Sequence, residues 1–190
     1  MPSTASPFGL APANHPSGVV RPFAMTITSG YASNIFANSP VKIVPSSTGE
    51  GTIAVAAAGD SFIGTFQGVE FTDSDGRRRV SNKWTASTAA TDIVAYVTID
   101  QSITYEIQSN AALAVADIGK QYDFTAPAGN TTTGLSSQAL DVASVVTSGG
   151  TAQLRLIGIV PGPDNVAGDN FTIVEVQVAE HQNVADRAAY

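Results

Sequence analysis

The sequence contains no cysteine, and this absence removes several kinds of chemistry at once. A disulfide framework, a thiolate nucleophile and a cysteine-based metal site are all excluded. Charged residues are also scarce: they make up 13% of the chain, against about 25% in an average globular protein. Gly, Thr, Ser and Ala dominate the remainder. A neutral surface rich in hydroxyl groups is typical of many β-proteins that pack into larger assemblies.

Basic residues are fewer than acidic ones. Nine Lys and Arg residues face 16 Asp and Glu residues, giving a formal net charge of −7. Because binding to a nucleic-acid backbone needs clustered Lys and Arg, we expect no nucleic-acid partner. The one basic cluster is Arg77, Arg78 and Arg79. It is either a solvated strand end beside Asp73 and Asp75 or an electrostatic contact with an acidic protein neighbour.

Long hydrophobic runs are missing as well. No apolar stretch reaches the length that spans a membrane, and the first residues lack the basic leader and apolar run of a signal peptide. We therefore expect a soluble protein without a membrane partner that is not exported by the general secretory route.

The residue types that usually carry catalysis are poorly placed. The two histidines, His15 in a proline-rich segment and His181 near the end of the chain, are predicted to be surface or arm residues, and a G-x-S-x-G elbow is absent. The sequence "DSDG" at Asp73–Gly76 predicts a hairpin turn, because the first and last positions of a calcium loop would lack carboxylates. We expect no enzymatic activity, no catalytic residues, no metal and no cofactor. Alanine at either histidine should leave folding intact.

The pattern that is present is alternation of apolar and polar residues. The segment "IVAYVTIDQSITYEIQ", residues Ile93–Gln108, alternates across a short polar break and predicts an antiparallel β-hairpin with one buried face. Thr98 is expected on the outer face. The residues expected to point inward are Ile93, Val97, Ile103, Tyr105 and Ile107.

Other short apolar runs are separated by residues that turn a chain, and they predict further strands. The only candidate helix is short and lies near Ala112–Lys120. The fold class is therefore all-β: a single β-sandwich or barrel-like domain with an extended N-terminal arm and at most one short helix. The expected strands, besides those of the hairpin, are Val41–Val44, Thr52–Ala56, Phe62–Phe66, Gly68–Thr72, Ala152–Val160 and Phe171–Val178.

The two ends of the chain differ from its middle. Five of the ten prolines lie within the first 22 residues, which argues against a helix or a central strand there. We assign residues 1–24 to an extended arm, 25–179 to the β-rich body and 180–190 to a C-terminal tail. The arm keeps five large apolar residues, so it packs either across its own domain or over a neighbouring subunit. Its removal up to residue 23 should leave the body folded.

Several segments resemble, in their order along the chain, structural proteins of tailed bacteriophages. They include "PFGLAPANHPSGVVRP", "ITSGYASNIFANSPVKI", "GTIAVAAAGDSFIGTFQGVEFTDSDGR", "TDIVAYVTIDQSITYEIQ", "DIGKQYDF" and "QLRLIGIVPGPDN" followed by "NFTIVEVQVAEHQ". The family is that of capsid decoration proteins, also called cement or head-stabilisation proteins. The resemblance covers nearly the whole chain, and none of its motifs is a catalytic signature.

The resemblance implies a β-rich body, made in the host cytoplasm, that binds the outer surface of the major capsid protein shell in the virion and bridges neighbouring subunits. It implies the major capsid protein as partner, with a homo-oligomer or neighbouring copies on the capsid. Two other classes stay open: a tail or fibre component, and a carbohydrate-binding module or hydrolase. The residues expected to contact the partner are Phe8, Leu10, Val19, Val20, Arg21, Phe23, Arg77, Arg78 and Arg79.

Overall fold

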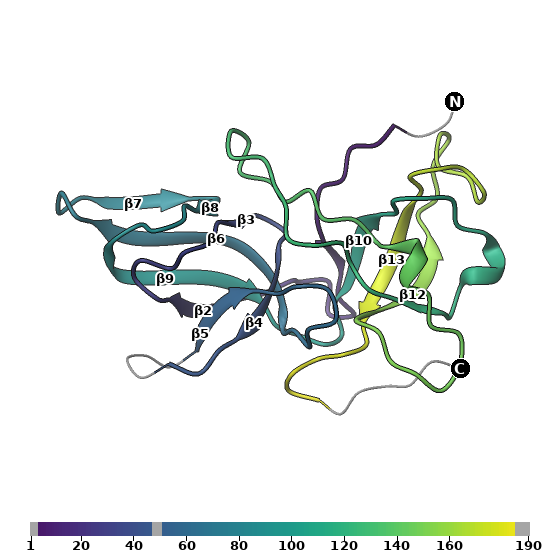
Figure 1. Ribbon diagram of the computed structural model, residues 1–190, viewed down its shortest axis with the longest axis horizontal. Coiled ribbons are helices and arrows are strands. Elements are labelled where there is room, and N and C mark those ends of the chain that lie inside the picture. The colour runs from purple at the N-terminus through teal and green to yellow at the C-terminus, as the bar shows by residue number, and fades with distance from the viewer. Residues whose placement is uncertain (1–3, 47–50, 185–190) are drawn as a thin grey trace.

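The protein folds into two β-rich lobes that lie side by side along its longest axis (Figure 1). The computed structural model describes residues 4–46 and 51–184. The first lobe consists of strands β2 to β9, and the second consists of β1 and β10 to β13. The all-β class and the barrel-like architecture expected from the sequence are confirmed.

The first lobe is built on a closed ring of five strands. Their order is β4-β5-β2-β9-β6, and the pairing of β4 with β6 closes the ring. Strands β2 and β5 are parallel, whereas the other pairs in the ring are antiparallel. The five strands are β2 (Pro22–Ile27), β4 (Pro40–Ile43), β5 (Thr52–Val55), β6 (Gly64–Asp73) and β9 (Ala90–Thr98).

Three short strands complete this lobe. Strand β7 (Arg78–Ser81) pairs with the far end of β6, after the turn that "DSDG" predicts, and forms an edge of the sheet. Strands β3 (Ile35–Phe36) and β8 (Lys83–Trp84) form a small sheet of their own. The ring of Trp84 meets that of Phe71 edge to face, with the centroids 5.4 Å apart.

Alternation along the long strands produces the core of the first lobe. Val69 on β6, Ala95 and Val97 on β9, and Ile53 on β5 are at most 1% exposed and pack together. Each large apolar side chain buried in this way stabilises the fold by roughly 1.5–3 kcal/mol before entropy costs.

The second lobe is a five-stranded antiparallel sheet whose inner face is covered by loops. The strand order is β1-β10-β13-β12-β11. Its core contains Tyr105, Val176 and Leu154 from the sheet and Leu113 and Phe124 from the covering loops. The strands are β1 (Ala11–Asn14), β10 (Thr104–Gln108), β11 (Gln121–Tyr122), β12 (Leu154–Ile159) and β13 (Ile173–Val178).

Within the described residues, helical structure is limited to two turns of 3-10 helix in the second lobe. The first, η1 (Val115–Asp117), lies inside the segment 112–120 where a short helix was expected. The second, η2 (Val142–Ser144), begins after Asp141, whose carboxylate accepts a hydrogen bond from the Ala143 amide.

The predicted hairpin at Ile93–Gln108 is wrong as a pairing. Strand β9 pairs with β2 and β6, whereas β10 pairs with β1 and β13, so the two strands belong to different lobes. A strand has only two edges, and both edges of each strand are occupied by others. The burial assignment was better: Val97, Ile103, Tyr105 and Ile107 are buried, and Ile93 is half-buried.

The expected outward placement of Thr98 is also wrong, because Thr98 is 1% exposed and lies where the lobes meet. Its hydroxyl is 2.8 Å from that of Thr65 and 3.3 Å from that of Tyr105. Burial raises the pKa of Tyr105 to about 12. The backbones of β6 and β9 approach closely here. A Cβ on Gly64, whose φ is +151°, would lie 1.5 Å from the Thr98 carbonyl oxygen.

The expected surface position of His181 is wrong as well, because this residue is 3% exposed. Its Nε2 lies 3.2 Å from the Ile99 carbonyl oxygen, and its Nδ1 accepts a hydrogen bond from the Asn183 amide. Burial lowers the pKa of His181. Residues 180–184 therefore pack on the body, with Phe62 and Gln182 hydrogen-bonded to each other, and the remainder of the assigned tail, 185–190, lies outside the described residues.

The assigned arm runs through both lobes of its own chain. Strand β1 is an edge strand, which suits Pro12, and Pro22 is the first residue of β2. Strand β2 is central in its sheet, which the proline count had argued against. Removing residues 1–23 would delete β1 and expose the second core, so we expect that the body would not stay intact.

Candidate interaction surface

Three of the expected contact residues in the arm face the protein itself. Leu10 is fully buried in the core of the second lobe, and Val20 packs against the same core. Phe8 is half-buried and lines a groove of about 600 Å³ between the N-terminal segment and the loop that contains Pro161 and Pro163. For Leu10 and Val20, packing across the chain's own domain is the arrangement that the structure adopts, whereas Phe8 lines an open groove.

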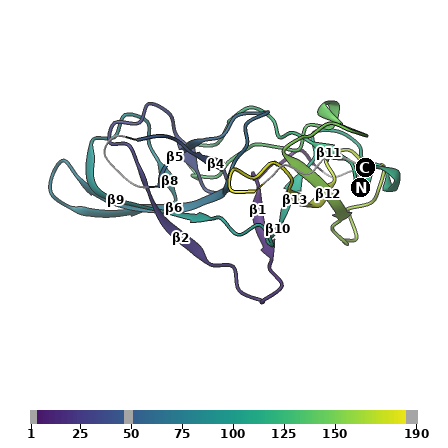
Figure 2. The same ribbon diagram turned by 90° about the horizontal axis from the view of Figure 1, so that it is seen from below.

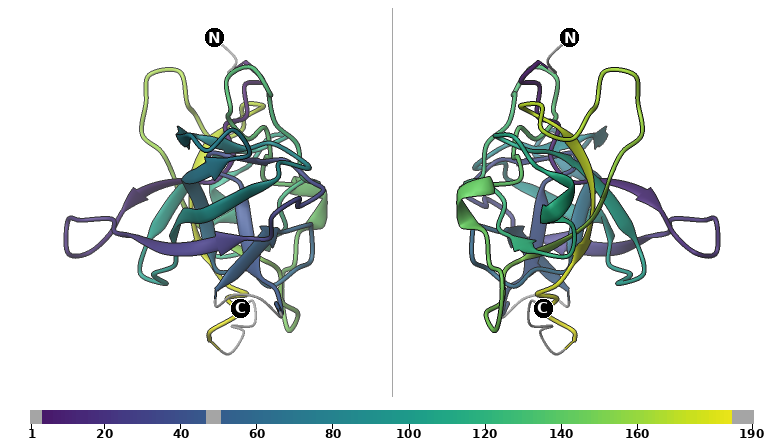
Figure 3. Two further views of the ribbon diagram at one scale, coloured as in Figure 1. Left: turned by 90° about the vertical axis from the view of Figure 1, so that its left-hand side faces the viewer. Right: turned by 90° about the vertical axis from the view of Figure 1, so that its right-hand side faces the viewer.

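The remaining three lie on or beside a loop that projects from the body. Residues 15–21 connect β1 to β2, and the loop extends away from both lobes (Figures 2 and 3). Val19 is 57% exposed and Phe23 is 47% exposed. Arg21 is exposed and has no hydrogen bond or ion pair to any other described residue. Val19, Arg21 and Phe23 line the same small cavity beside the loop, and we call these three residues the strip.

The projecting loop is held by hydrogen bonds at its base. His15 Nδ1 lies 2.6 Å from Ser17 Oγ and accepts a bond from the Ser17 amide, while His15 Nε2 lies 3.2 Å from an Asp100 carboxylate oxygen. We call His15, Ser17 and Asp100 the brace. The Ser102 amide and, to a smaller degree, His15 lower the pKa of the Asp100 carboxyl. Brace and strip together line a cavity of about 100 Å³.

In the brace, a histidine lies between a serine and an aspartate, as in the catalytic triad of a serine hydrolase. The hydrogen bonds around the brace nevertheless differ from those of a triad. Nδ1 of His15 already accepts the Ser17 amide proton, so its lone pair is shared. A triad also needs free backbone amides as an oxyanion hole. The neighbouring amides are engaged: that of Gly18 donates to the His15 carbonyl and that of Val19 donates to Ser17 Oγ. We interpret the brace as a device that fixes the loop.

The arginine cluster is paired within its own hairpin. Arg78 lies 3.2 Å from Glu70, and Arg79 contacts both Asp73 and Asp75. Arg77 lies 3.7 Å from Asp75. The Ser74 amide and then Arg79 lower the pKa of the Asp73 carboxyl. These contacts favour the solvated strand end over an electrostatic contact with a partner.

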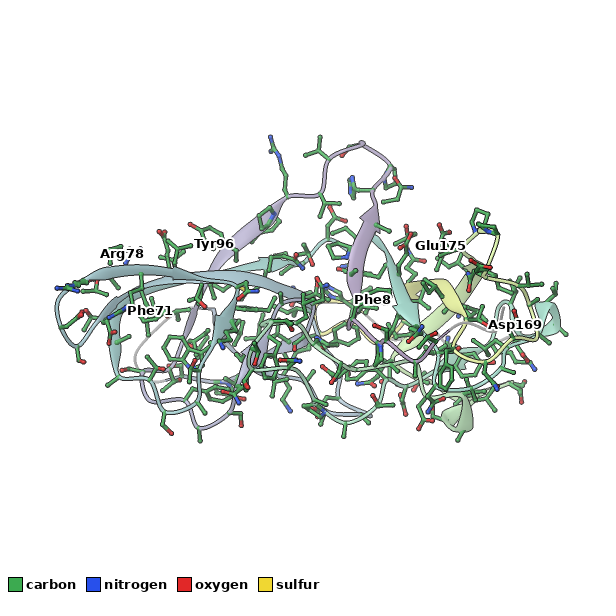
Figure 4. The ribbon with its side chains drawn as sticks, turned by 90° about the horizontal axis from the view of Figure 1, so that it is seen from above. Phe8, Phe71, Arg78, Tyr96, Asp169 and Glu175 are labelled. Carbon is green, nitrogen blue, oxygen red and sulfur yellow. The ribbon has the colours of Figure 1, made fainter. Side chains whose placement is uncertain are left out.

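Charge is divided unequally between the two halves of the sequence. Residues 1–98 contain six basic and six acidic residues, whereas residues 99–190 contain three basic and ten acidic ones, so the second half carries the whole net charge of −7. Arg78 lies at one end of the molecule, while Glu175 and Asp169 lie toward the other (Figure 4). Glu106 and Glu175 are directly opposite each other on β10 and β13.

Comparisons with family models, curated proteins and solved structures give no match for this chain. Among residues 4–46 and 51–184, no group of three or more histidine or acidic side chains is arranged to hold a metal ion. Within the same described ranges, no helix is both long enough and apolar enough to cross a membrane.

Sequence reasoning included Val19, Arg21 and Phe23 among the expected contact residues but could not separate them from Phe8, Leu10 and Val20. The sequence Val-Val-Arg-Pro-Phe at residues 19–23 has no alternation that would separate the two sets. The brace was missed because Asp100 is far from His15 in the sequence and reaches it only through the turn after β9.

Proposed function

We propose that this chain is a structural virion protein that binds the outer surface of a major capsid protein shell and bridges neighbouring subunits. The observation that carries the proposal is the projecting loop with the adjoining start of β2, where Val19 and Phe23 are exposed and Arg21 has no hydrogen bond or ion pair to another described residue. Free-standing apolar groups on a braced loop are suited to a protein–protein contact. The resemblance to capsid decoration proteins supports the same function.

The two-lobed body suits a bridging role. Each lobe has its own apolar core, and the lobes are joined by hydrogen bonds through Thr98, His181 and Gln153. A rigid elongated body can contact two neighbouring subunits at once, and linked contacts strengthen each other without any single strong site. An acidic exterior also reduces binding to free nucleic acid during assembly.

The test is electron microscopy of phage particles made with and without this protein. We expect additional density on the outer surface of the shell only when the protein is present. Particles without it should lose their DNA at a lower temperature, as followed with a dye that reports released DNA. Density at the tail instead would identify a tail or fibre component. Binding to glycans in the absence of any particle would identify a carbohydrate-binding module.

A second measurement is co-sedimentation of the purified full chain with undecorated shells. Because truncation would remove β1, the informative variant replaces residues 16–19 and 21 with Gly and Ser and keeps β1, β2 and the core residue Val20. We expect this variant to remain folded by circular dichroism and to bind shells more weakly. Failure of the intact chain to bind shells at all would contradict the proposed function.

A further inference from the structure

We infer that the strip, Val19, Arg21 and Phe23, is the part of the molecule that inserts into the shell protein, at an apolar socket that carries a carboxylate. The inference rests on the proposed function and specifies the contact within it. It excludes the arginine cluster and the inward-facing arm residues, which the sequence could not separate from the strip.

Exposure selects these three residues. Leu10 and Val20 already contribute to the core of the second lobe, so they cannot turn toward a partner without opening that core. Val19 and Phe23 leave about half of their surfaces in water at 57% and 47% exposure. Burying such groups against a partner supplies a favourable hydrophobic contribution that the free protein does not have.

The charge of Arg21 indicates which group the partner should offer. The arginines of the β6–β7 hairpin each have a carboxylate partner in the same hairpin, so a binding partner would have to displace it. Arg21 has no such partner among the described residues. A guanidinium between two apolar side chains is complementary to a carboxylate at the rim of an apolar socket, and arginine commonly forms paired hydrogen bonds with such a group.

The brace lowers the entropy cost of binding. Loop residues that are free in solution lose conformational freedom when a partner orders them. Here the contacts of His15 with Ser17 and Asp100 and the ring of Pro16 restrict the loop beforehand. The strip is therefore presented in one arrangement.

The experiment compares variants of the full chain in co-sedimentation with undecorated shells. Phe23→Ser should weaken binding at least tenfold, and Val19→Ser should weaken it about three- to tenfold. Arg21→Glu should weaken it more than tenfold at low salt, with a smaller loss as the salt concentration rises and screens the charge. The matched control is Val80→Ser on β7: Val80 is 79% exposed, so it tests whether any exposed valine has the same effect.

Unfolding temperatures of all variants should stay close to that of the parent, because the changed side chains are exposed. The inference is overturned if the intact chain binds shells and the strip variants bind equally well, or if Val80→Ser is the variant that loses binding; the proposed function would survive either result. It is also overturned if the strip variants bind shells normally but dissociate a homo-oligomer in sedimentation velocity. If the intact chain does not bind shells, the proposed function and this inference fail together.

Discussion

The two lobes close their cores by different means. In the first lobe the five-stranded ring closes on itself, and its buried polar residues are the hydroxyl side chains Ser39, Thr52, Thr65 and Thr98. In the second lobe an open sheet is covered by loops, and its buried polar residues include four glutamines. These are Gln108, Gln121, Gln138 and Gln153.

The difference follows from where backbone groups find partners. In a closed ring the neighbouring strands satisfy the buried N–H and C=O groups. A loop that covers a core has no such neighbour, and each buried backbone group still requires a hydrogen bond. The glutamine amide offers both a donor and an acceptor, as a peptide group does. Gln153, for example, accepts from the Phe124 amide and donates to the carbonyls of Ala57 and Asp60.

The largest effect should come from removing that amide. Gln153→Leu keeps the size of the side chain but leaves the buried Phe124 amide without its acceptor and removes the bonds to the carbonyls of Ala57 and Asp60. We expect it to lower the free energy of unfolding by about 3–5 kcal/mol, measured by urea denaturation. The control is Gln177→Leu on the outer face of β13, where the half-buried amide donates one bond to the Gln101 carbonyl. Equal losses at the two positions would refute the role assigned to buried glutamines.

In the first lobe, truncation of an apolar residue and truncation of a buried hydroxyl residue should have similar effects. Val97→Ala should cost about 1–3 kcal/mol through the cavity that it leaves. Thr98→Ala should cost about 1–2 kcal/mol, because the hydroxyls of Thr65 and Tyr105 lose a buried partner. Thr91→Ala, on the exposed part of β9, should be close to neutral in the same urea titration. A neutral Thr98→Ala would restore the outward placement predicted from alternation.

As the pH falls, protonation linked to His181 at the junction between the lobes should lower the free energy of unfolding at a higher pH than protonation of the carboxylates does. Burial lowers the pKa of His181 from its ordinary value of 6.5. Below about pH 6.5 the unfolded chain therefore binds a proton at His181 that the folded chain does not bind. The free energy of unfolding should decline as the pH falls through this range. Lys120 lowers the pKa of the Asp117 carboxyl, so that contribution is lost only below the ordinary value of 3.8.

Thermal unfolding between pH 7 and pH 5 tests this order of events. His181→Gln should flatten the decline over that range, although it is less stable than the parent at pH 7 because the Ile99 and Asn183 contacts are altered. His15→Ala should keep the decline. A decline that persists in His181→Gln would assign the acid sensitivity to another group.

The smallest effect should come from the excess of acidic residues in the second lobe. Glu106 and Glu175 face each other across β10 and β13, and like charges in that position repel. Glu106→Gln should raise the free energy of unfolding by less than about 1 kcal/mol, and the gain should shrink in high salt. Thr104→Val on the same strand face is a control without a charge change. A loss of stability in Glu106→Gln would mean that this carboxylate has a favourable role that its neighbours do not reveal.

Sequence alternation predicted the positions of β4, β5, β12 and β13 well, because each is a short apolar run between turn residues. It also placed Val97, Tyr105 and Ile107 correctly in the interior. Alternation reports which face of a strand is buried, but it contains no information about which strand pairs with which. For that reason β9 and β10 were assigned to one hairpin, although each fills a gap in a different sheet.

The candidate surface was predicted less completely. Apolar residues in a proline-rich segment indicated a contact, and the structure divides them into inward and outward sets. The divisions that could not be predicted depend on distant residues: Leu10 is buried because β1 pairs with β10, and His181 is buried because residues 180–184 pack beside Phe62. Both depend on contacts between one end of the chain and a segment in its middle.

The pairing of β1 with β10 also determines when the second lobe can fold as the chain is synthesised. Asn14 and Thr104 are hydrogen-bonded neighbours although 90 residues separate them in the chain. At a typical elongation rate of about 5–20 residues per second, β1 waits roughly 5–20 s on the ribosome before its partner exists. During that time Leu10 and Val20 have no core to enter, while the strands of the first lobe can already begin to pair. The first lobe would then serve as the template on which the second is completed, and the nascent N-terminal segment would be the part most in need of a chaperone.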